Sequence, residues 1–495
     1  MNRPEAEAGP VPAAIAAAYD PNRFRYDGHR LIAILGQQLE RAERRDDAPV
    51  LPWVEPAASL AAWPAEFPED GGADLVDHLQ RVIAASIRLH HPRYLGHQVA
   101  PPLPAAALAD LVGAVRNNGM AVYEMGPAAT PIELACVRWM AQQLGFPDGA
   151  GGVITSGGSV GNLTALLAAR QATAGFDAWS GGAHAGPPLA VLCSAQVHYS
   201  ISRALRIMGW GDGGAVAVPV DDRFRLRPEA LAAALGRAAD DGRRVIAVVA
   251  SAGSTATGSF DPLDEIAGLC GERGLWLHVD GAHGGSAALS ARHRGLVAGI
   301  ERADSVVWDA HKMMMMPALL TAVLFRDGRR SYEAFAQDAS YLFTAERPDD
   351  EWWNLGQRTL ECTKRMMAAQ LYAALTAHGR GLFEEIVDRL FALGRSLAAR
   401  VAAAGDFELA YPPEANIVCF RWRGAGGGAA ADLDGLQAAI RRRALELGRY
   451  YLVQTRLDGA LWLRCALMNP LTEDGDLDGL LEHLREIGRG LGQGG

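Results

Sequence analysis

The sequence predicts an α/β protein built on a mainly parallel sheet that helices cover on both faces. From about residue 106 to 385, short apolar runs alternate with segments of helical periodicity, which is the pattern of strand–helix units. Several runs end at small, polar or charged residues, and ligands of such sheets bind at the carboxyl ends of strands. The six runs are 152–154, 190–193, 245–250, 275–279, 305–308 and 321–325.

Two further parts flank this central domain. Residues 1–105 contain helical segments joined by proline-rich connections and lack strand alternation, so we expect a helical N-terminal segment that packs on another surface, such as a partner subunit. Residues 386–495 predict a small α+β C-terminal domain. Its expected elements are a long helix at 382–404, strands at 417–422 and 461–467, and a last helix from about residue 477.

Composition restricts the function classes. The chain has 495 residues, 49% of them hydrophobic, and a formal net charge of -10 without a long basic block, which argues against nucleic acid as a partner. No apolar run reaches the length of a membrane span, and the first residues lack a secretory h-region, so we expect neither a membrane span nor a secretory leader. The six cysteines are scattered, with no CxxC pair, so we expect no metal site and a cytoplasmic protein.

Asp280 and Lys312 are the most informative pair. Each follows an apolar run, and the two lie thirty-two positions apart, so both are expected at the same edge of the sheet. Pyridoxal phosphate chemistry needs an amine that forms a Schiff base with the cofactor and an acid that keeps the pyridine nitrogen protonated. The structural alternative is a buried salt bridge between the two residues.

A turn rich in glycine and serine, Ser156-Gly157-Gly158-Ser159, follows the run at 152–154 and opens a helical segment. Glycines let backbone N–H groups approach an anion, and a helix N-terminus favours negative charge. The hydroxyl groups of both serines can add hydrogen bonds to a phosphate. The alternative is an ordinary turn with a serine cap.

Other residues with binding chemistry stand at the ends of further runs. His198 could stack on a pyridine ring or transfer protons, Thr255 could contact ring substituents, and His311 could bind the phosphate. Ala282 would leave room for a flat ring. For His198 the structural alternative is an ordinary loop or helix-start histidine, and for Thr255 it is a turn that ends a strand.

Two residues nearer the C-terminus could act on a substrate. Arg464 interrupts an otherwise apolar strand, and a guanidinium there favours a carboxylate partner, either a ligand or an acid of the chain itself. Tyr341 lies in a long segment with little periodicity, from 327 to 351, which is typical of a lid. It could be a general acid or a packed aromatic residue.

Together these motifs resemble, in order, those of the group II pyridoxal-phosphate-dependent amino acid decarboxylases. This family includes glutamate, aromatic amino acid, cysteine sulfinate and diaminobutyrate decarboxylases. The resemblance extends from about residue 91 to 470. It is carried by His91-Pro92-Arg93-Tyr94, 156–159, Gln196-Val197-His198-Tyr199-Ser200, Ala252-Gly253-Ser254-Thr255, His278-Val279-Asp280-Gly281-Ala282 and His311-Lys312.

The resemblance implies a fold type I enzyme with a seven-stranded type of sheet, acting as a homodimer with the active site at the subunit interface. It assigns Lys312 as the Schiff-base lysine, Tyr341 as the lid proton donor, and Arg464 as the carboxylate-binding arginine. His97 would lie on the substrate side. The implied pyridoxal 5'-phosphate ligands are Ser156, Gly157, Gly158, Ser159, His198, Thr255, Asp280, Ala282, His311 and Lys312.

Some positions depart from the family pattern. Asp309-Ala310 precede His311 where many relatives carry Asn-Pro, and His283 stands where glutamate decarboxylases often have tryptophan. His97 is similar to the diaminobutyrate branch, whereas the segment around Tyr341 is similar to the glutamate branch. The identity of the amino acid substrate therefore stays open.

The sequence predicts α-decarboxylation of an L-amino acid to an amine and CO2, through the Lys312 Schiff base and a quinonoid. In this prediction Tyr341 or His198 returns the proton. An alternative keeps the cofactor but couples decarboxylation to oxidative deamination, or performs another lyase or transferase reaction. A non-catalytic dimer with a scaffold role is a third possibility, which the presence of Asp280, His198 and Lys312 disfavours.

Overall fold

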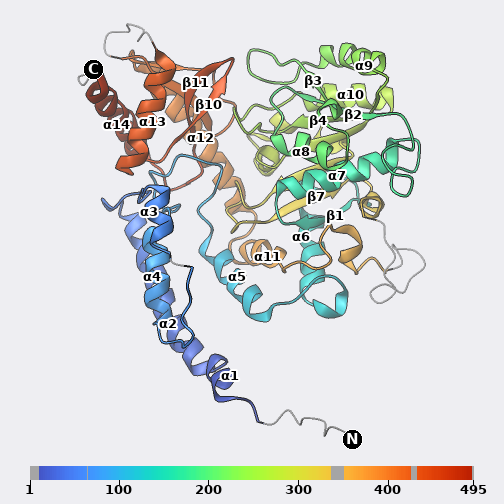
Figure 1. Ribbon diagram of the computed structural model, residues 1–495. Coiled ribbons are helices and arrows are strands. Elements are labelled where there is room, and N and C mark those ends of the chain that lie inside the picture. Colours follow the sequence, from blue (N-terminus) through green and yellow to red (C-terminus); the bar gives the residue numbers. More distant parts are fainter. Residues whose placement is uncertain (1–9, 64, 336–350, 425–431, 493–495) are drawn as a thin grey trace, which may run out of the picture.

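A mainly parallel seven-stranded sheet forms the centre of the computed structural model, which describes residues 10–63, 65–335, 351–424 and 432–492 (Figure 1). Its strand order is β1-β7-β6-β5-β4-β2-β3, and β7 alone runs antiparallel to its neighbours. The strands are β1 (Gly151–Thr155), β2 (Leu189–Ser194), β3 (Ala215–Val218), β4 (Arg244–Ser251), β5 (Trp276–Asp280), β6 (Ser305–Asp309) and β7 (Thr321–Phe325).

The α/β fold predicted from the sequence is confirmed, and each of the six apolar runs forms a strand. The run pattern missed β3, a short edge strand whose residues are mostly half-exposed. The direction of β7 has a simple cause. Only residues 310–320 separate it from β6, and a parallel return needs a longer crossover, whereas an antiparallel one does not.

Helices cover both faces of the sheet, because alternate strand residues point to opposite sides. Val153 packs in the core beneath one helix layer and the adjacent Ile154 packs in the core on the other side. The first layer consists of α7 (Gly158–Thr173) and α8 (Tyr199–Ile207), and the second includes α6 (Ala129–Gln143), α9 (Leu231–Asp240) and α10 (Leu263–Arg273). Continuous apolar strands follow from burial on both faces.

A second, antiparallel sheet with the order β10-β11-β9-β8 lies in the C-terminal part of the chain. Of its strands, β9 and β11 match the predicted runs, while β8 and β10 were not predicted. The elements are α12 (Gly381–Ala403), β8 (Phe407–Leu409), β9 (Ile417–Trp422), α13 (Leu433–Leu447), β10 (Val453–Leu457), β11 (Ala460–Ala466) and α14 (Asp474–Gly492).

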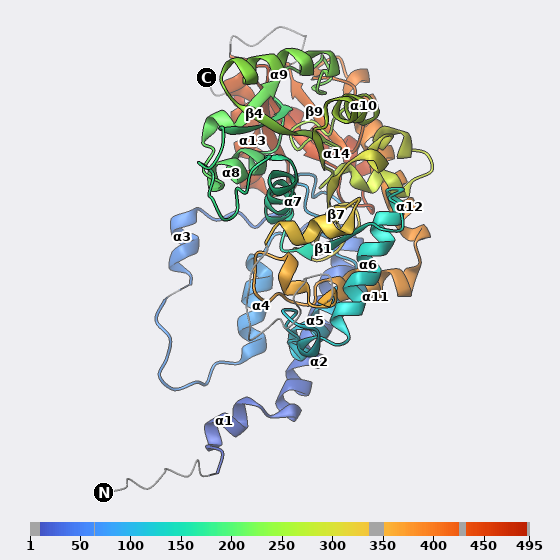
Figure 2. The same cartoon turned by 90° about the vertical axis from the view of Figure 1, so that its right-hand side faces the viewer.

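The N-terminal helices form an arm that extends from the body in both views (Figures 1 and 2). Helix α1 has no buried residue, and the arm carries exposed aromatic side chains such as Tyr19 and Phe24. The helices of this part are α1 (Ala13–Ala18), α2 (Pro21–Glu43), α3 (Pro56–Ala61), α4 (Leu75–Ala85) and α5 (Pro104–Arg116), and α5 packs against α11 (Ala368–His378).

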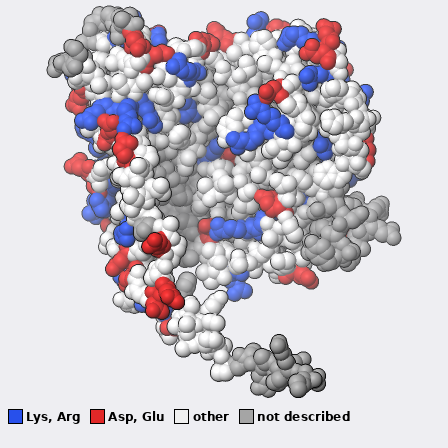
Figure 3. Space-filling model, viewed as in Figure 1, with Lys and Arg blue, Asp and Glu red and all other residues white. Residues whose placement is uncertain are grey.

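Acidic and basic side chains are interspersed over the face of the molecule drawn in Figure 3. No helix within the described residues combines the length and apolarity needed to cross a membrane.

Candidate active site

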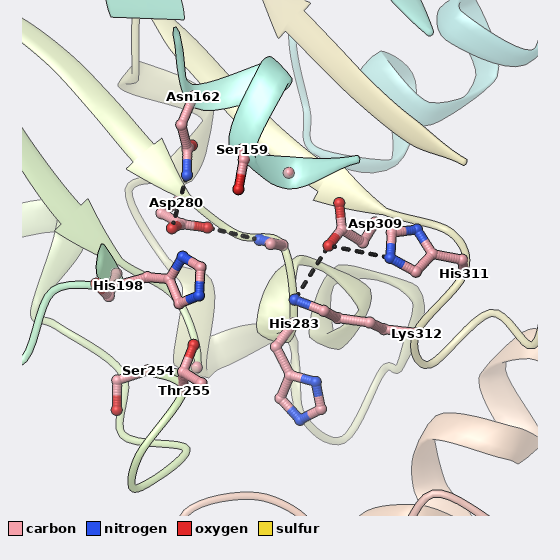
Figure 4. A pocket seen from close by; sticks show the side chains of 14 residues that line it. Ser159, Asn162, His198, Ser254, Thr255, Asp280, His283, Asp309, His311 and Lys312 are labelled. Atoms are coloured by element: carbon pink, nitrogen blue, oxygen red, sulfur yellow. Dashed lines mark hydrogen bonds and ion pairs between the residues drawn. The ribbon is translucent and has the colours of Figure 1, made fainter. Parts of the chain in front are cut away.

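The fold brings Asp280 and Lys312 to one cavity. Asp280 is the last residue of β5, and Lys312 follows the end of the neighbouring strand β6. Both side chains line a cavity of about 170 Å³ at the carboxyl ends of these strands (Figure 4). This is the position in which open α/β sheets bind ligands.

Lys312 forms an ion pair with Asp309 rather than with Asp280. Its Nζ atom lies 3.0 Å from Oδ2 of Asp309, whose side chain is 3% exposed. Burial would raise the pKa of Asp309, but Lys312 and His311 hold that pKa below its ordinary value. The buried salt bridge that was the structural alternative for Asp280 and Lys312 is not the arrangement found.

The Asp280 carboxylate is instead held by neutral donors. Oδ2 accepts a hydrogen bond of 3.0 Å from the amide of Asn162, and Oδ1 accepts one of 3.2 Å from the backbone N–H of Ala282. Asp280 makes no ion pair of 4.0 Å or less with any residue that the structure describes. Its negative charge therefore lacks a cationic partner within the described chain.

The whole chain contains only two lysines, Lys312 and Lys364. Lys364 is buried in the core, where its ammonium pairs with Glu133 and donates a hydrogen bond of 2.6 Å to the carbonyl of Ile154. Burial lowers the pKa of Lys364, and Glu133 opposes that effect. Of the two amines, Lys312 is therefore the one available at the cavity.

The glycine- and serine-rich turn leads into α7, whose N-terminus opens on the cavity. Gly157 precedes the helix with φ 120°, a conformation that favours glycine, and no side chain caps the first helical N–H groups. At Gly161 a Cβ atom would lie only 3.1 Å from the side chain of Val307, so glycine lets α7 lie close to the sheet. These free N–H groups and the positive helix end suit an anion.

The four predicted residues of this turn are not equivalent. Gly158 and Ser159 line the cavity, whereas Ser156 and Gly157 are not part of its lining. The hydroxyl of Ser156 donates a hydrogen bond of 2.7 Å to Glu361. The role of Ser156 and Gly157 in holding a phosphate therefore stays a prediction.

His198 and Ala282 both line the cavity. Their place on opposite faces of a flat ring stays a prediction. His198 caps the N-terminus of α8, where its Nδ1 atom accepts a hydrogen bond of 3.3 Å from the backbone of Ser200. Burial lowers the pKa of His198, an effect that the carboxylate of Asp280 opposes. His198 is thus held mainly neutral, with its ring directed into the cavity (Figure 4).

The loop after β4 and the residues next to Lys312 complete the lining. Thr255 lies on this loop, and His311 follows β6 with its Nε2 atom 3.6 Å from Asp309. His283 lies below the Lys312 side chain in Figure 4. It is fully buried, which lowers its pKa to about 3, and it shares a hydrogen bond of 2.8 Å with Asn416.

A second cavity of about 370 Å³ adjoins the first, and His198 and Thr255 line both. His97 and Arg464, the two predicted substrate-side residues, line this second cavity. Arg464 is 5% exposed. Its guanidinium donates hydrogen bonds to the carbonyls of Gly96, Thr255 and Ala256.

Arg464 makes no ion pair within 4.0 Å among the described residues. The structural alternative for Arg464, a pair with an acid of its own chain, is therefore not found within this part of the protein. A buried guanidinium without an anion is unfavourable, so the second cavity suits a carboxylate ligand.

Sequence reasoning missed Asn162 as a site residue, and Tyr341 lies outside the described residues. Asn162 occupies the second turn of α7, on the face toward β5 and β6, and the helical period from the predicted helix start could have placed it there. Asp309 and His283 were noticed only as departures from the family pattern. Among the described residues, no cluster of three or more side chains is arranged to hold a metal ion.

The donor set fits pyridoxal phosphate. The cavity offers an amine, an acid that lacks a cation, an imidazole, a small side chain and a helix N-terminus. These match the aldehyde, the pyridine nitrogen, the two ring faces and the phosphate of that cofactor. A family model for the pyridoxal-dependent decarboxylase conserved domain matches residues 56–423.

The chain belongs to the pyridoxal-dependent decarboxylase family. As a member of that family it is an enzyme, a pyridoxal-phosphate-dependent amino acid decarboxylase, and pyridoxal phosphate is its cofactor. The resemblance inferred from the sequence motifs is confirmed.

Similar proteins support the same family. The acidic amino acid decarboxylase GADL1 of Bos taurus is 32% identical over 429 residues, which cover 84% of this chain and 81% of that protein. The cysteine sulfinic acid decarboxylase of Mus musculus is 30% identical over 453 residues, which cover 89% of this chain and 92% of that protein. The crystal structure of mouse CSAD matches the fold with a TM-score of 0.88 at 28% identity, covering 95% of this chain and 99% of that one.

Proposed function

We propose that this decarboxylase removes the α-carboxylate of an L-amino acid with a short acidic side chain, giving CO2 and the corresponding amine. The observation that carries the proposal is Arg464, a buried guanidinium with no anion among the described residues, beside the Lys312 cavity. The names of the similar cattle and mouse proteins, which refer to acidic amino acids and cysteine sulfinic acid, support the same substrate class.

When bound, pyridoxal phosphate supplies an aldehyde that condenses with a primary amine and a ring that accepts the electrons of a breaking bond. Lys312 would hold the aldehyde covalently, and Asp280 would keep a proton on the ring nitrogen. The N–H groups at Gly158 and Ser159, with His311, would bind the phosphate. His198 and Ala282 would lie against opposite faces of the ring, and Thr255 would contact its edge.

Arg464 suits the side-chain acid better than the departing carboxylate. A strong ion pair on the group that leaves as CO2 would stabilise the substrate more than the transition state, which slows the reaction. An ion pair on the side-chain acid is unchanged during the reaction and orients the substrate. His97, on the same cavity wall, would add a polar contact.

The protein's own acids and bases would complete the reaction. Tyr341 or His198 would return a proton to the α-carbon after CO2 leaves. Of the two, His198 lines both cavities, whereas Tyr341 lies outside the described residues.

The active enzyme would be a homodimer with the site near the interface. The arm exposes Tyr19 and Phe24 at 84% and 61%, and α5 exposes a row of aliphatic side chains. Contiguous exposed apolar surface of this kind marks a protein–protein contact. The α5 residues are Leu108, Leu111, Val112 and Val115.

The test is a screen for CO2 release from acidic, diamino and aromatic L-amino acids by the purified holoenzyme, with oxygen consumption followed in parallel. We expect turnover of an acidic substrate such as L-aspartate, L-glutamate or L-cysteine sulfinate without oxygen uptake. Turnover confined to diamino or aromatic substrates would contradict the substrate class. Oxygen uptake matched to CO2 release would indicate coupled oxidative deamination instead.

A further inference from the structure

A buried chain of hydrogen bonds connects Asp280 with His198. The side-chain amide of Asn162 donates to Oδ2 of Asp280 at 3.0 Å and to Oγ of Ser200 at 2.8 Å. Oγ of Ser200 lies 2.8 Å from Nδ1 of His198. One amide group on α7 therefore contacts the acid at the end of β5 and, through the hydroxyl of Ser200, the imidazole at the start of α8. Figure 4 shows the hydrogen bond between Asn162 and Asp280.

The chain continues into the core on the other side of Asn162. Oδ1 of Asn162 lies 2.9 Å from Nε2 of His278, and Nδ1 of His278 lies 2.9 Å from Oγ of Ser305. Trp276 donates its indole N–H to the same oxygen at 2.9 Å. All of these side chains are buried. His278 and Asp280 point to the same face of β5 because they are two residues apart in a strand.

Chemistry fixes where each proton lies. The ionised Asp280 only accepts hydrogen bonds, so the NH2 group of Asn162 must face it and the carbonyl oxygen must face His278. His278 then carries its proton on Nε2. Its Nδ1 atom accepts from Ser305, whose hydroxyl oxygen in turn accepts from Trp276. Burial agrees with a neutral His278, since it lowers the pKa of that residue to about 4.

The other branch fixes the tautomer of His198. Oγ of Ser200 accepts a hydrogen bond from Asn162, so the hydroxyl's own proton is free to point at Nδ1 of His198. The backbone N–H of Ser200 points at the same Nδ1 atom, at 3.3 Å. With two donors aimed at it, Nδ1 carries no proton, and the neutral imidazole has its proton on Nε2.

We propose that Asn162 is a positioning residue for two cofactor-binding groups. It orients the Asp280 carboxylate, and through Ser200 it fixes His198 in the tautomer that is protonated on Nε2. This inference rests on the proposed roles of Asp280 under the ring nitrogen and of His198 against the ring. Asn162 touches neither substrate nor reacting atoms in this assignment.

The arrangement has a chemical consequence for His198. Its Nε2–H is a hydrogen-bond donor at the cavity, while a second proton on Nδ1 would have to displace the hydrogen bonds from Ser200. Neutral His198 is therefore favoured, in agreement with its burial. As an imidazolium, His198 would lose the hydrogen bond from the backbone N–H of Ser200, and the Ser200 hydroxyl would have to turn so that its oxygen accepts from Nδ1.

The proton positions can be read by nitrogen NMR of the full-length protein labelled with 15N-histidine, with and without pyridoxal phosphate. The His198 signals are assigned from a His198→Asn variant. We expect a bare Nδ1 and a protonated Nε2 at neutral pH. In Ser200→Ala and Asn162→Ala the two tautomers should mix. Ser202→Ala, whose hydroxyl bonds to the backbone of Tyr199 on the same helix, should match the parent protein.

Cofactor affinity gives a second measurement. Asn162→Ala should weaken pyridoxal phosphate binding about 10- to 100-fold, the loss expected for a hydrogen bond to a charged group, while Ser202→Ala should not change it. A proton on Nδ1 of His198 in the parent protein, or unchanged spectra in both Ser200→Ala and Asn162→Ala, would overturn the inference. If the spectra change as expected but cofactor affinity does not, the tautomer assignment stands and the proposed contact of Asp280 and His198 with the cofactor fails.

Discussion

Lys312 and Asp309 form an ion pair at the wall of the cofactor cavity, with 3.0 Å between Nζ and Oδ2. The carboxylate of Asp309 is almost completely buried, so the amine has an anionic partner inside the protein. The carboxylate also accepts a hydrogen bond from Thr321 and lies 3.6 Å from His311. Asp309 thereby balances the charge of the reactive amine before the cofactor is bound.

A double-mutant cycle tests that balance in the cofactor-free protein. Asp309→Asn should lower the free energy of unfolding by about 3 kcal/mol, because one member of a buried pair loses its partner. Lys312→Met should also destabilise the protein. The double variant should lose less than the sum of the two, with a coupling of at least about 1 kcal/mol by denaturant unfolding. Additive losses would show that the pair contributes nothing.

Covalent trapping can identify the cofactor lysine, because the chain has only Lys312 and Lys364. Borohydride reduction of the holoenzyme should fix pyridoxal phosphate on the peptide that contains Lys312, as detected by mass spectrometry. Lys364 should stay unmodified, since Glu133 and the Ile154 carbonyl hold its ammonium in the core. Lys312→Arg should abolish the visible absorbance of the bound cofactor. Label on Lys364 would refute the assignment.

The proposed role of Arg464 predicts a loss of activity on the acidic substrate that replacing a nearby arginine does not cause. Arg464→Met should lower kcat/KM for the acidic substrate between about 10- and 100-fold, the range for a hydrogen-bonded charged contact. Arg421→Met is a matched control, because Arg421 lies on the neighbouring strand β9 and pairs with Glu408 at 2.8 Å. Its effect should not exceed about threefold. Equal losses in the two variants would make Arg464 a structural residue.

Acid stability should reflect the buried histidines. His283 and His278 have pKa values of about 3 and about 4 in the folded protein, against 6.5 ordinarily, because burial disfavours the charged form. Below about pH 6.5 the unfolded chain binds protons at these sites while the folded protein does not, so stability falls as pH falls. Each such histidine steepens the fall by up to about 1.4 kcal/mol per pH unit.

The slope of the unfolding free energy against pH tests the contribution of a single histidine. The variant His283→Asn lacks one group that takes up a proton on unfolding. Between pH 6 and pH 4 its free energy of unfolding should therefore fall less steeply than that of the parent protein, by about 1.4 kcal/mol per pH unit. His184→Asn, at an exposed position, should leave the slope unchanged. Equal slopes in the parent protein and in His283→Asn would show that His283 is not held neutral.

The strands of the sheet and the positions of Asp280 and Lys312 at its edge could be predicted because the sequence patterns that indicate them are local. An apolar run that ends in Asp280 or leads to Lys312 can be read from neighbouring residues, and adjacent parallel strands bring such ends together. The partner of Lys312 could not be predicted in the same way. Asp280 and Asp309 both end strands beside the lysine, and only the path of the turn after β6 decides which carboxylate the amine meets.

The same limit applies to β3 and Asn162. The run Ala215–Val218 is half-exposed at the sheet edge, so its weak hydrophobic signal resembles a loop. Asn162 looks like an ordinary polar residue in a helix. Its importance comes from the close approach of α7 to the sheet, which Gly161 permits against β6 and β7 and which no local pattern reveals.

The two serines of the turn before α7 provide a contrast that sequence alone could not predict. Ser159 lines the cavity, whereas the hydroxyl of Ser156 donates to Glu361. Ser159→Ala should weaken pyridoxal phosphate binding about tenfold, as one lost hydrogen bond to an anion does. Ser156→Ala should change it by less than about threefold if the contact with Glu361 persists when the cofactor binds. Absorbance titration of the two variants gives both dissociation constants. A larger loss in Ser156→Ala would mean that its hydroxyl leaves Glu361 to bind the phosphate.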